Sequence, residues 1–166
     1  AGLERTSALE HDARGFLELS QKYRATHAML VPVQYRRLMD LPDFDSFDLA
    51  SYRMKTCTSA PFAADLKADI LKRWPGGLVE IYGMTENAAI STVNHPGRIK
   101  LGTVGEAHPG VEIRLDKETG EILTRSPAVF IGYFKDPDAT RAAKDADGWL
   151  HTGDVGEWVD GTHLKI

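Results

Sequence analysis

The order strand, helix, strand in the first half of the chain constrains its fold most strongly. Residues 53–58 and 78–82 have strand character, and residues 62–74 between them carry apolar side chains at helical spacing. This order predicts two parallel strands joined by a right-handed crossover through the helix. Ligands of such sheets bind beyond the carboxyl ends of the strands, which correspond here to the loops 58–61 and 83–87.

The rest of the first half adds two helices and a further strand. Residues 12–23 have apolar side chains at helical spacing, and Asp12 is a candidate N-cap. The apolar run 26–31 predicts a buried strand, and a proline then introduces a short helix over residues 33–39. The acidic stretch 40–48 lacks the ligand spacing and the turn glycine of a calcium loop, so we interpret it as a solvated surface loop.

Glycine punctuates the remaining part of the chain, where the segments are short and alternating. Turn residues between these segments are typical of β-hairpins. We expect hairpins over residues 111–126 and 158–166, and one helix over residues 137–144. The predicted fold class is therefore α/β. A partial parallel sheet with flanking helices would occupy residues 1–96, followed by a β-rich, mainly antiparallel subdomain over residues 97–166.

Composition excludes several classes of function. The 24 acidic and 20 basic residues give a net charge of −4. The chain therefore lacks the excess of basic residues that is typical of nucleic-acid-binding proteins. No apolar run approaches the roughly 18 residues that a transmembrane helix needs, and no signal peptide is evident. The single Cys57 excludes an internal disulfide framework and is expected to be a buried apolar residue. We therefore expect a cytoplasmic globular protein.

A short motif at the end of the predicted strand 78–82 carries the first chemical signal. It reads Tyr82-Gly83-Met84-Thr85-Glu86. An aromatic ring, a hydroxyl and a carboxylate at a strand end suit a nucleotide: the ring can stack on a base, the hydroxyl can donate to a phosphate, and the carboxylate can bind Mg²⁺. The alternative is a core aromatic followed by an ordinary turn, because short motifs often occur by chance.

Further motifs follow in a fixed order. They are Gly-Thr-Val-Gly at 102–105, Gly-Glu-Ile-Leu at 120–123, Gly-Tyr-Phe-Lys-Asp-Pro at 132–137, and Asp-Gly-Trp-Leu-His-Thr-Gly-Asp-Val-Gly at 147–156. Together with the motif at 82–86, this set resembles the adenylate-forming superfamily of acyl-CoA synthetases, peptide adenylation domains and beetle luciferases. The resemblance covers essentially the whole chain.

The resemblance implies a set of nucleotide-binding residues. The loop formed by Ser59, Ala60 and Pro61 matches the loop that frames the adenine, and Tyr82 matches the aromatic residue that stacks on it. Asp154 matches the carboxylate that accepts two ribose hydroxyls.

The same resemblance implies the residues that face the phosphates. Thr85 matches the hydroxyl near the α-phosphate, and Glu86 matches the carboxylate associated with Mg²⁺. Both are the expected catalytic residues, and Gly83 and Met84 complete the nucleotide loop. Met84, Asn87 and Ala88 either line the acyl pocket or are ordinary packing residues, because sequence determines pocket shape weakly.

The function implied is that of an ATP-dependent acid–CoA ligase. Such an enzyme activates a carboxylic acid, fatty or aromatic, as an acyl-adenylate and transfers it to coenzyme A. Its small-molecule partners would be the acid, ATP with Mg²⁺, and CoA; homo-oligomerisation is left open. The alternatives are an amino-acid adenylation domain that loads a carrier protein, or a non-catalytic nucleotide-binding module. Met84 and His151 favour the CoA ligases, since adenylation domains commonly have Pro and Arg there.

The resemblance also implies that the 166 residues are an internal piece of a large N-terminal domain, in which the subdomain 97–166 leads to the hinge before the C-terminal domain. The phosphate loop of the superfamily and the C-terminal domain with its lysine are not among the recognisable motifs. The 166-residue chain by itself is therefore expected to be inactive.

Overall fold

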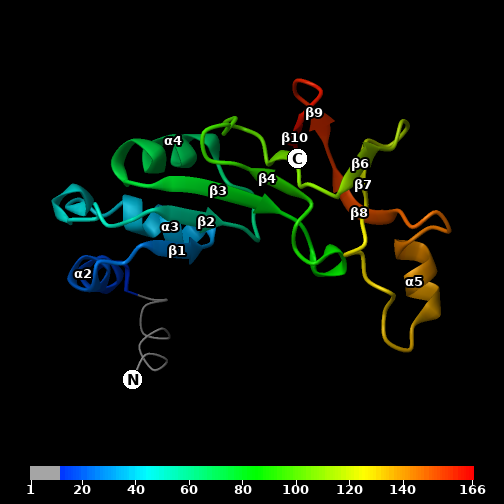
Figure 1. Ribbon diagram of the computed structural model, residues 1–166, viewed down its shortest axis with the longest axis horizontal. Coiled ribbons are helices and arrows are strands. Elements are labelled where there is room, and N and C mark those ends of the chain that lie inside the picture. Colours follow the sequence, from blue (N-terminus) through cyan, green and yellow to red (C-terminus); the bar gives the residue numbers. More distant parts are fainter. Residues whose placement is uncertain (1–11) are drawn as a thin grey trace. The chain divides into compact units, whose positions relative to one another are not determined.

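A computed structural model describes residues 12–166 (Figure 1). These residues form two compact units, 12–79 and 80–166. Strand β3 (Gly77–Tyr82) begins in the first unit and ends in the second. The domain boundary expected near residue 96 stays a prediction.

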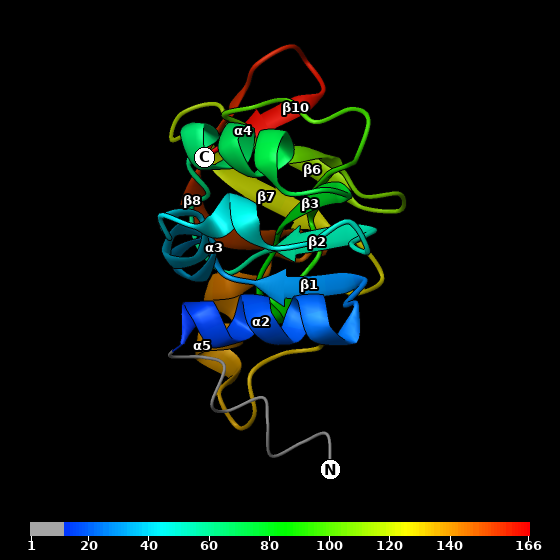
Figure 2. The ribbon, with the colours of Figure 1, turned by 90° about the vertical axis from the view of Figure 1, so that its left-hand side faces the viewer.

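The first unit combines parallel strands with helices. Its elements are α2 (Ala13–Tyr23), β1 (His27–Leu30), α3 (Pro32–Met39), the 3₁₀ turn η1 (Phe44–Ser46), β2 (Met54–Cys57), α4 (Ala64–Arg73) and the start of β3. Strands β1 and β2 pair in parallel, and Figure 2 shows α2 and α3 alongside them. The Gly77 amide donates to the Arg53 carbonyl oxygen at 2.9 Å. Strand β3 thus starts at the same edge as β2, as expected for the crossover through α4.

Aromatic side chains form the centre of this first unit. Trp74, which follows α4, is 1% exposed. Its ring meets four others edge-on, with centroids 5.1 to 6.4 Å away: Phe16, Tyr35, Phe44 and Tyr52. Contacts of this kind each stabilise by about 0.5–1.5 kcal/mol beyond area burial. They connect α2, α3 and the loop after α3 to the crossover helix.

Three details of the first unit differ from the sequence expectations. The side chain of Asp12 makes no capping hydrogen bond to α2. Tyr23, expected on the apolar face of that helix, is 56% exposed, because the buried positions of α2 are Leu17 and Ser20. Strand β1 is not fully buried either: its residues alternate between exposed and half-buried, and Met29 is 69% exposed.

The second unit is mainly antiparallel. After β3 it contains the 3₁₀ turn η2 (Thr85–Asn87), β4 (Thr92–Asn94), β5 (Gly105–Ala107), β6 (Glu112–Leu115), β7 (Glu121–Arg125), α5 (Pro137–Ala143), β8 (Leu150–Val155), β9 (Glu157–Trp158) and β10 (His163–Lys165). The end of β3 pairs with β4, followed by β5, β10 and β9, all antiparallel. Strands β6, β7 and β8 form a separate antiparallel sheet. Both predicted hairpins and the predicted helix are confirmed, whereas the sequence did not indicate β4.

A tryptophan organises the smaller sheet. Trp149 is 8% exposed, and the guanidinium groups of Arg114 and Arg125 lie 4.2 and 4.5 Å from its ring centroid. Arg125 also binds both carboxylate oxygens of Glu112 on the neighbouring strand, at 2.9 and 2.7 Å. Contacts of a guanidinium group with an aromatic face, such as those of Arg114 and Arg125 with Trp149, stabilise the fold by about 0.5–1 kcal/mol at exposed sites. They fix β8, the strand that carries Asp154.

Two further observations concern the described residues. The Cys57 side chain in β2 is fully buried, as predicted, and forms no disulfide. Within residues 12–166, no helix combines the length and the apolar character that crossing a membrane would require.

Candidate functional site

The predicted motif at 82–86 forms the turn between β3 and η2. Tyr82 is the last residue of β3 and is half-buried, whereas Thr85 at the start of η2 is exposed. The hydroxyl and the carboxylate of the motif therefore follow a strand end directly. This is the position at which α/β sheets bind ligands.

A glycine makes the turn after β3 possible. A Cβ atom at Gly83 would lie 2.3 Å from the carbonyl carbon of Ala89, which is far inside contact distance. The chain returns to this point because the Ala89 amide donates to the Met84 carbonyl oxygen at 2.8 Å, and the Ser91 amide donates to the Tyr82 carbonyl oxygen at 2.7 Å. Only a residue without a side chain permits the two backbone segments to approach this closely.

The side chain of Asn87 stabilises this turn through hydrogen bonds. Its side chain is 3% exposed, and its Oδ1 accepts the Met84 amide at 2.9 Å. Its Nδ2 donates to Ser91 Oγ at 2.7 Å and lies 3.4 Å from Thr124 Oγ1 on β7. The amide is thus engaged with protein partners, whereas the neighbouring Ala88 is exposed, with a positive φ of 55°.

The two residues expected to bind the nucleoside lie in direct contact. The Tyr82 hydroxyl donates to Asp154 Oδ2 at 2.8 Å, although the residues are 72 positions apart in sequence. Asp154 is fixed in turn, because its amide donates to Thr152 Oγ1 at 3.1 Å and Thr152 Oγ1 donates to the Ile122 carbonyl oxygen at 2.8 Å. Burial, and then the Asp154 carboxylate, raise the pKa of Tyr82, so its hydroxyl remains a donor at neutral pH.

Glu86 has a partner that the sequence did not reveal. The Tyr133 hydroxyl donates to Glu86 Oε1 at 2.9 Å across 47 positions of sequence. The hydrogen bond to this carboxylate raises the pKa of Tyr133. Tyr133 stands in the motif at 132–137, but no role could be assigned to it, since only the fold brings it to Glu86.

The donor set around Glu86 fits one kind of metal site. Residues 12–166 contain no group of three or more His, Cys, Asp or Glu side chains that could hold an ion by themselves. Mg²⁺ is commonly bound by one or two carboxylates together with substrate phosphates. Glu86, with the exposed Thr85 beside it, suits a Mg²⁺ ion that arrives with a nucleotide.

The remaining predicted nucleotide residues belong to the first unit. Ser59, Ala60 and Pro61 are exposed and follow the carboxyl end of β2, and Ser59 has a positive φ of 75°. The loop thus lies at a strand end, as expected. Its contact with adenine stays a prediction.

The sequence was also compared with known proteins. The profile of the AMP-binding enzyme family matches residues 3–134, which is most of the chain. The chain belongs to the AMP-binding enzyme family. Asp154 lies beyond the matched range, so its assignment rests on the motif at 147–156 and on its contact with Tyr82.

Curated relatives of this AMP-binding enzyme include ligases and a luciferase. It is 35% identical over 160 residues to 4-coumarate–CoA ligase of Pinus taeda. The aligned region covers 87% of this chain and 30% of the relative. It is 31% identical over 162 residues to luciferin 4-monooxygenase of Photinus pyralis, covering 91% of this chain and 30% of the relative.

Solved structures confirm the α/β fold. The amide bond synthetase McbA from Marinactinospora thermotolerans matches with a TM-score of 0.83 at 30% identity, over 93% of this chain and 33% of that one. The anthranilate CoA ligase AuaEII, in complex with anthranoyl-AMP, matches with a TM-score of 0.82 at 25% identity, over 92% and 31%. The chain thus spans about a third of the length of the relatives that it matches.

Proposed function

We propose that this chain supplies part of the nucleotide site of an ATP-dependent acid–CoA ligase. The observation that carries the proposal is the hydrogen bond between Tyr82 and Asp154. The resemblance assigns the first residue to the base and the second to the ribose of one nucleotide. The two residues must lie close together to bind a single nucleoside, and this contact shows that they do.

On the nucleoside side, the ring of Tyr82 stacks on the adenine and its hydroxyl remains bound to Asp154. The Asp154 carboxylate accepts hydrogen bonds from the two ribose hydroxyls, since a carboxylate has several acceptor positions. The loop of Ser59, Ala60 and Pro61 is proposed for the adenine on the resemblance alone. The bond between Tyr82 and Asp154 supports this arrangement because it orients both groups before ligand arrives.

On the phosphate side, Thr85 donates to the α-phosphate and Glu86 holds Mg²⁺. The ion would neutralise phosphate charge when bound. Gly83 and Met84 form the backbone of the loop, which Asn87 holds in place through its buried amide. Met84 and Ala88 belong to the wall of the acid pocket, whereas the buried Asn87 acts on the pocket only through the shape of the loop.

The reaction proposed for the whole protein has two steps. The carboxylate oxygen of the acid attacks the α-phosphorus of ATP, and pyrophosphate leaves with the electron pair of the broken P–O bond. The thiolate of CoA then attacks the acyl carbon, which forms the thioester and releases AMP. Both steps depend on positioning and on stabilising developing charge.

The acid class is the part of the proposal that the relatives inform. Two of them are named for 4-coumarate and anthranilate, which are aromatic acids. Aromatic acids therefore come first among the candidate substrates, followed by short and long fatty acids.

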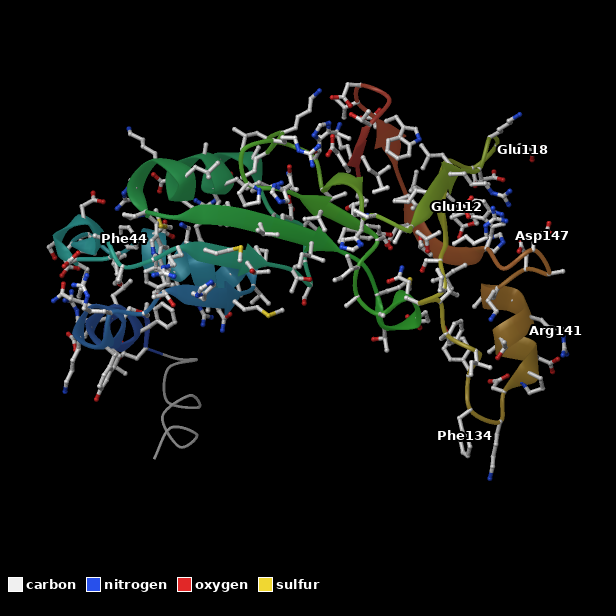
Figure 3. All side chains as sticks on the ribbon, in the orientation of Figure 1. Phe44, Glu112, Glu118, Phe134, Arg141 and Asp147 are labelled. Atoms are coloured by element: carbon white, nitrogen blue, oxygen red, sulfur yellow. The ribbon has the colours of Figure 1, made fainter. Side chains whose placement is uncertain are left out.

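The substitution Asp154→Ala tests the nucleoside assignment in the full-length protein. It should weaken ATP binding strongly, by on the order of 1.5–3 kcal/mol for each charged hydrogen bond lost, and leave acid binding nearly unchanged. Calorimetric titration of each ligand measures both effects. Asp147→Ala is the matched control, because it removes the same charge from an exposed position that Figure 3 labels. Equal weakening of both ligands by Asp154→Ala would contradict the proposal.

A further inference from the structure

The segment 130–133 meets Glu86 at two points. The Phe130 amide donates to the Glu86 carbonyl oxygen at 2.7 Å, and the Tyr133 hydroxyl donates to Glu86 Oε1 at 2.9 Å. One contact fixes the backbone of Glu86 and the other fixes its carboxylate. Neither Phe130 nor Tyr133 belongs to the set of nucleotide residues proposed above.

The same segment is anchored on the opposite side. Lys144 Nζ donates to the carbonyl oxygens of Phe130 and Ile131 at 2.8 and 3.2 Å. The Tyr133 amide donates to Thr140 Oγ1 on α5 at 2.9 Å. The rings of Phe130 and Tyr133 pack edge to face, with centroids 4.8 Å apart. The backbone and the ring of Tyr133 are thus both held in place, so the position of its hydroxyl beside Glu86 is fixed.

A carboxylate bound through one oxygen cannot rotate freely. Glu86 has two carboxylate oxygens, and Tyr133 engages Oε1. Hydrogen bonds of this kind orient metal-binding carboxylates, and their loss typically costs 10–100-fold in metal affinity or activity. We propose that Tyr133 is a positioning residue that orients the Glu86 carboxylate toward the Mg²⁺ of the bound nucleotide. This inference rests on the proposed function, in which Glu86 is the metal carboxylate.

The competing explanation is that Tyr133 only packs on the surface. The next residue, Phe134, is 88% exposed and projects away from the ribbon in Figure 3, whereas Tyr133 is 40% exposed. If packing were the whole role, the ring would matter and the hydroxyl would not. Tyr133→Phe separates the two explanations, because it retains the ring beside Phe130 and removes only the hydrogen bond.

The experiment uses the full-length protein, with Mn²⁺ as a spectroscopic substitute for Mg²⁺. Binding of Mn²⁺ to the protein–ATP complex is followed by electron paramagnetic resonance, and the Mg²⁺ dependence of adenylation is measured in parallel. Tyr133→Phe should weaken metal binding about tenfold and shift the Mg²⁺ half-saturation by the same factor. The unfolding temperature without ligands should stay unchanged. Tyr23→Phe, at an exposed position of α2, is the control and should change neither metal measurement.

Glu86→Gln separates failure of this inference from failure of the proposed function. If Glu86→Gln weakens metal binding and Tyr133→Phe does not, the positioning role is overturned and the metal role of Glu86 stands. If neither substitution changes metal binding, both are overturned. In the double variant the Tyr133 substitution should add nothing to the effect of Glu86→Gln, since the two residues act through one carboxylate. Additive effects would overturn the positioning role.

Discussion

At the scale of single residues, the turn after β3 depends on one close backbone approach. Gly83 lies against the backbone of Ala89, so a Cβ atom at position 83 would be only 2.3 Å from the Ala89 carbonyl carbon. The turn carries Thr85 and Glu86, so a shift of this backbone moves both groups that are proposed to face the phosphates. The geometry of the phosphate side therefore depends on a residue that contributes no side chain.

Replacing Gly83 by alanine should disrupt the turn. The added methyl group must displace the backbone at Ala89, and overpacking of this kind costs about 1–3 kcal/mol of stability. ATP binding should weaken as well, because Thr85 and Glu86 move with the turn. Titration with ATP and chemical unfolding measure the two effects.

Gly110→Ala is the matched control for this substitution. Gly110 has a positive φ of 84° and nothing within 4 Å of its Cβ position. Its replacement should cost stability through backbone strain, about 1–2 kcal/mol, without affecting ATP binding. Unchanged ATP affinity in Gly83→Ala would contradict the role of this glycine in the site.

The sequence predicted single site residues unevenly. Tyr82 and Asp154 could each be assigned to the nucleotide in advance because each belongs to a distinctive motif, but the hydrogen bond between them could not be predicted. Asn87 could be placed near the site but not within its hydrogen-bond network, since that network depends on Thr124, 37 positions away. Tyr133 was visible in a motif, but its partner Glu86 depends on the path of the chain between β7 and α5.

At the scale of elements, a buried lysine closes the crossover of the first unit. Lys55 on β2 is fully buried, and its Nζ donates to the carbonyl oxygens of Trp74, Pro75 and Gly76 at 3.0, 2.6 and 2.8 Å. These carbonyls follow the last turn of α4, where cations interact favourably with the helix dipole. The contact joins the end of the crossover helix to the sheet.

Lys55→Met should destabilise the protein by on the order of 2 kcal/mol at pH 7, because three carbonyl oxygens lose their donor, among them that of the buried Trp74. Burial lowers the pKa of Lys55 to about 8 from 10.5. The unfolded chain then binds more protons between these values, so the wild type should gain stability relative to the variant as pH rises from 8 to 10.5. Chemical unfolding across this range checks both results.

The control for Lys55→Met is Lys72→Met, at an exposed position in the last turn of α4. It should change stability by less than about 0.5 kcal/mol and leave the pH dependence unchanged. Equal losses in the two variants would show that the carbonyl contacts of Lys55 do not hold the crossover.

Most elements could be predicted because their signals are local. Prolines and spaced apolar residues indicated α3 and α4, and turn residues indicated the hairpin of β6 and β7. Strand β4 could not be predicted, because three residues are too few for a periodic pattern. Its pairing with β5 instead depends on Gly105, where a Cβ atom would lie 2.2 Å from the Val93 carbonyl oxygen.

At the scale of the whole molecule, family membership and site geometry support the same class of chemistry. The chain belongs to the AMP-binding enzymes and spans about a third of the relatives that it matches. Its second unit joins Tyr82 to Asp154 and Glu86 to Tyr133 by hydrogen bonds, and the resemblance assigns three of these residues to the nucleotide and its metal.

Acid-dependent exchange of pyrophosphate into ATP tests the central claim most directly. The full-length protein is incubated with ATP, Mg²⁺, labelled pyrophosphate and one acid at a time, from aromatic, short-chain, long-chain and amino acids. The account predicts exchange with an aromatic or fatty acid, and a CoA thioester with release of AMP once CoA is added. ATP binding without exchange for any acid, or exchange only with amino acids and no CoA thioester, would contradict it.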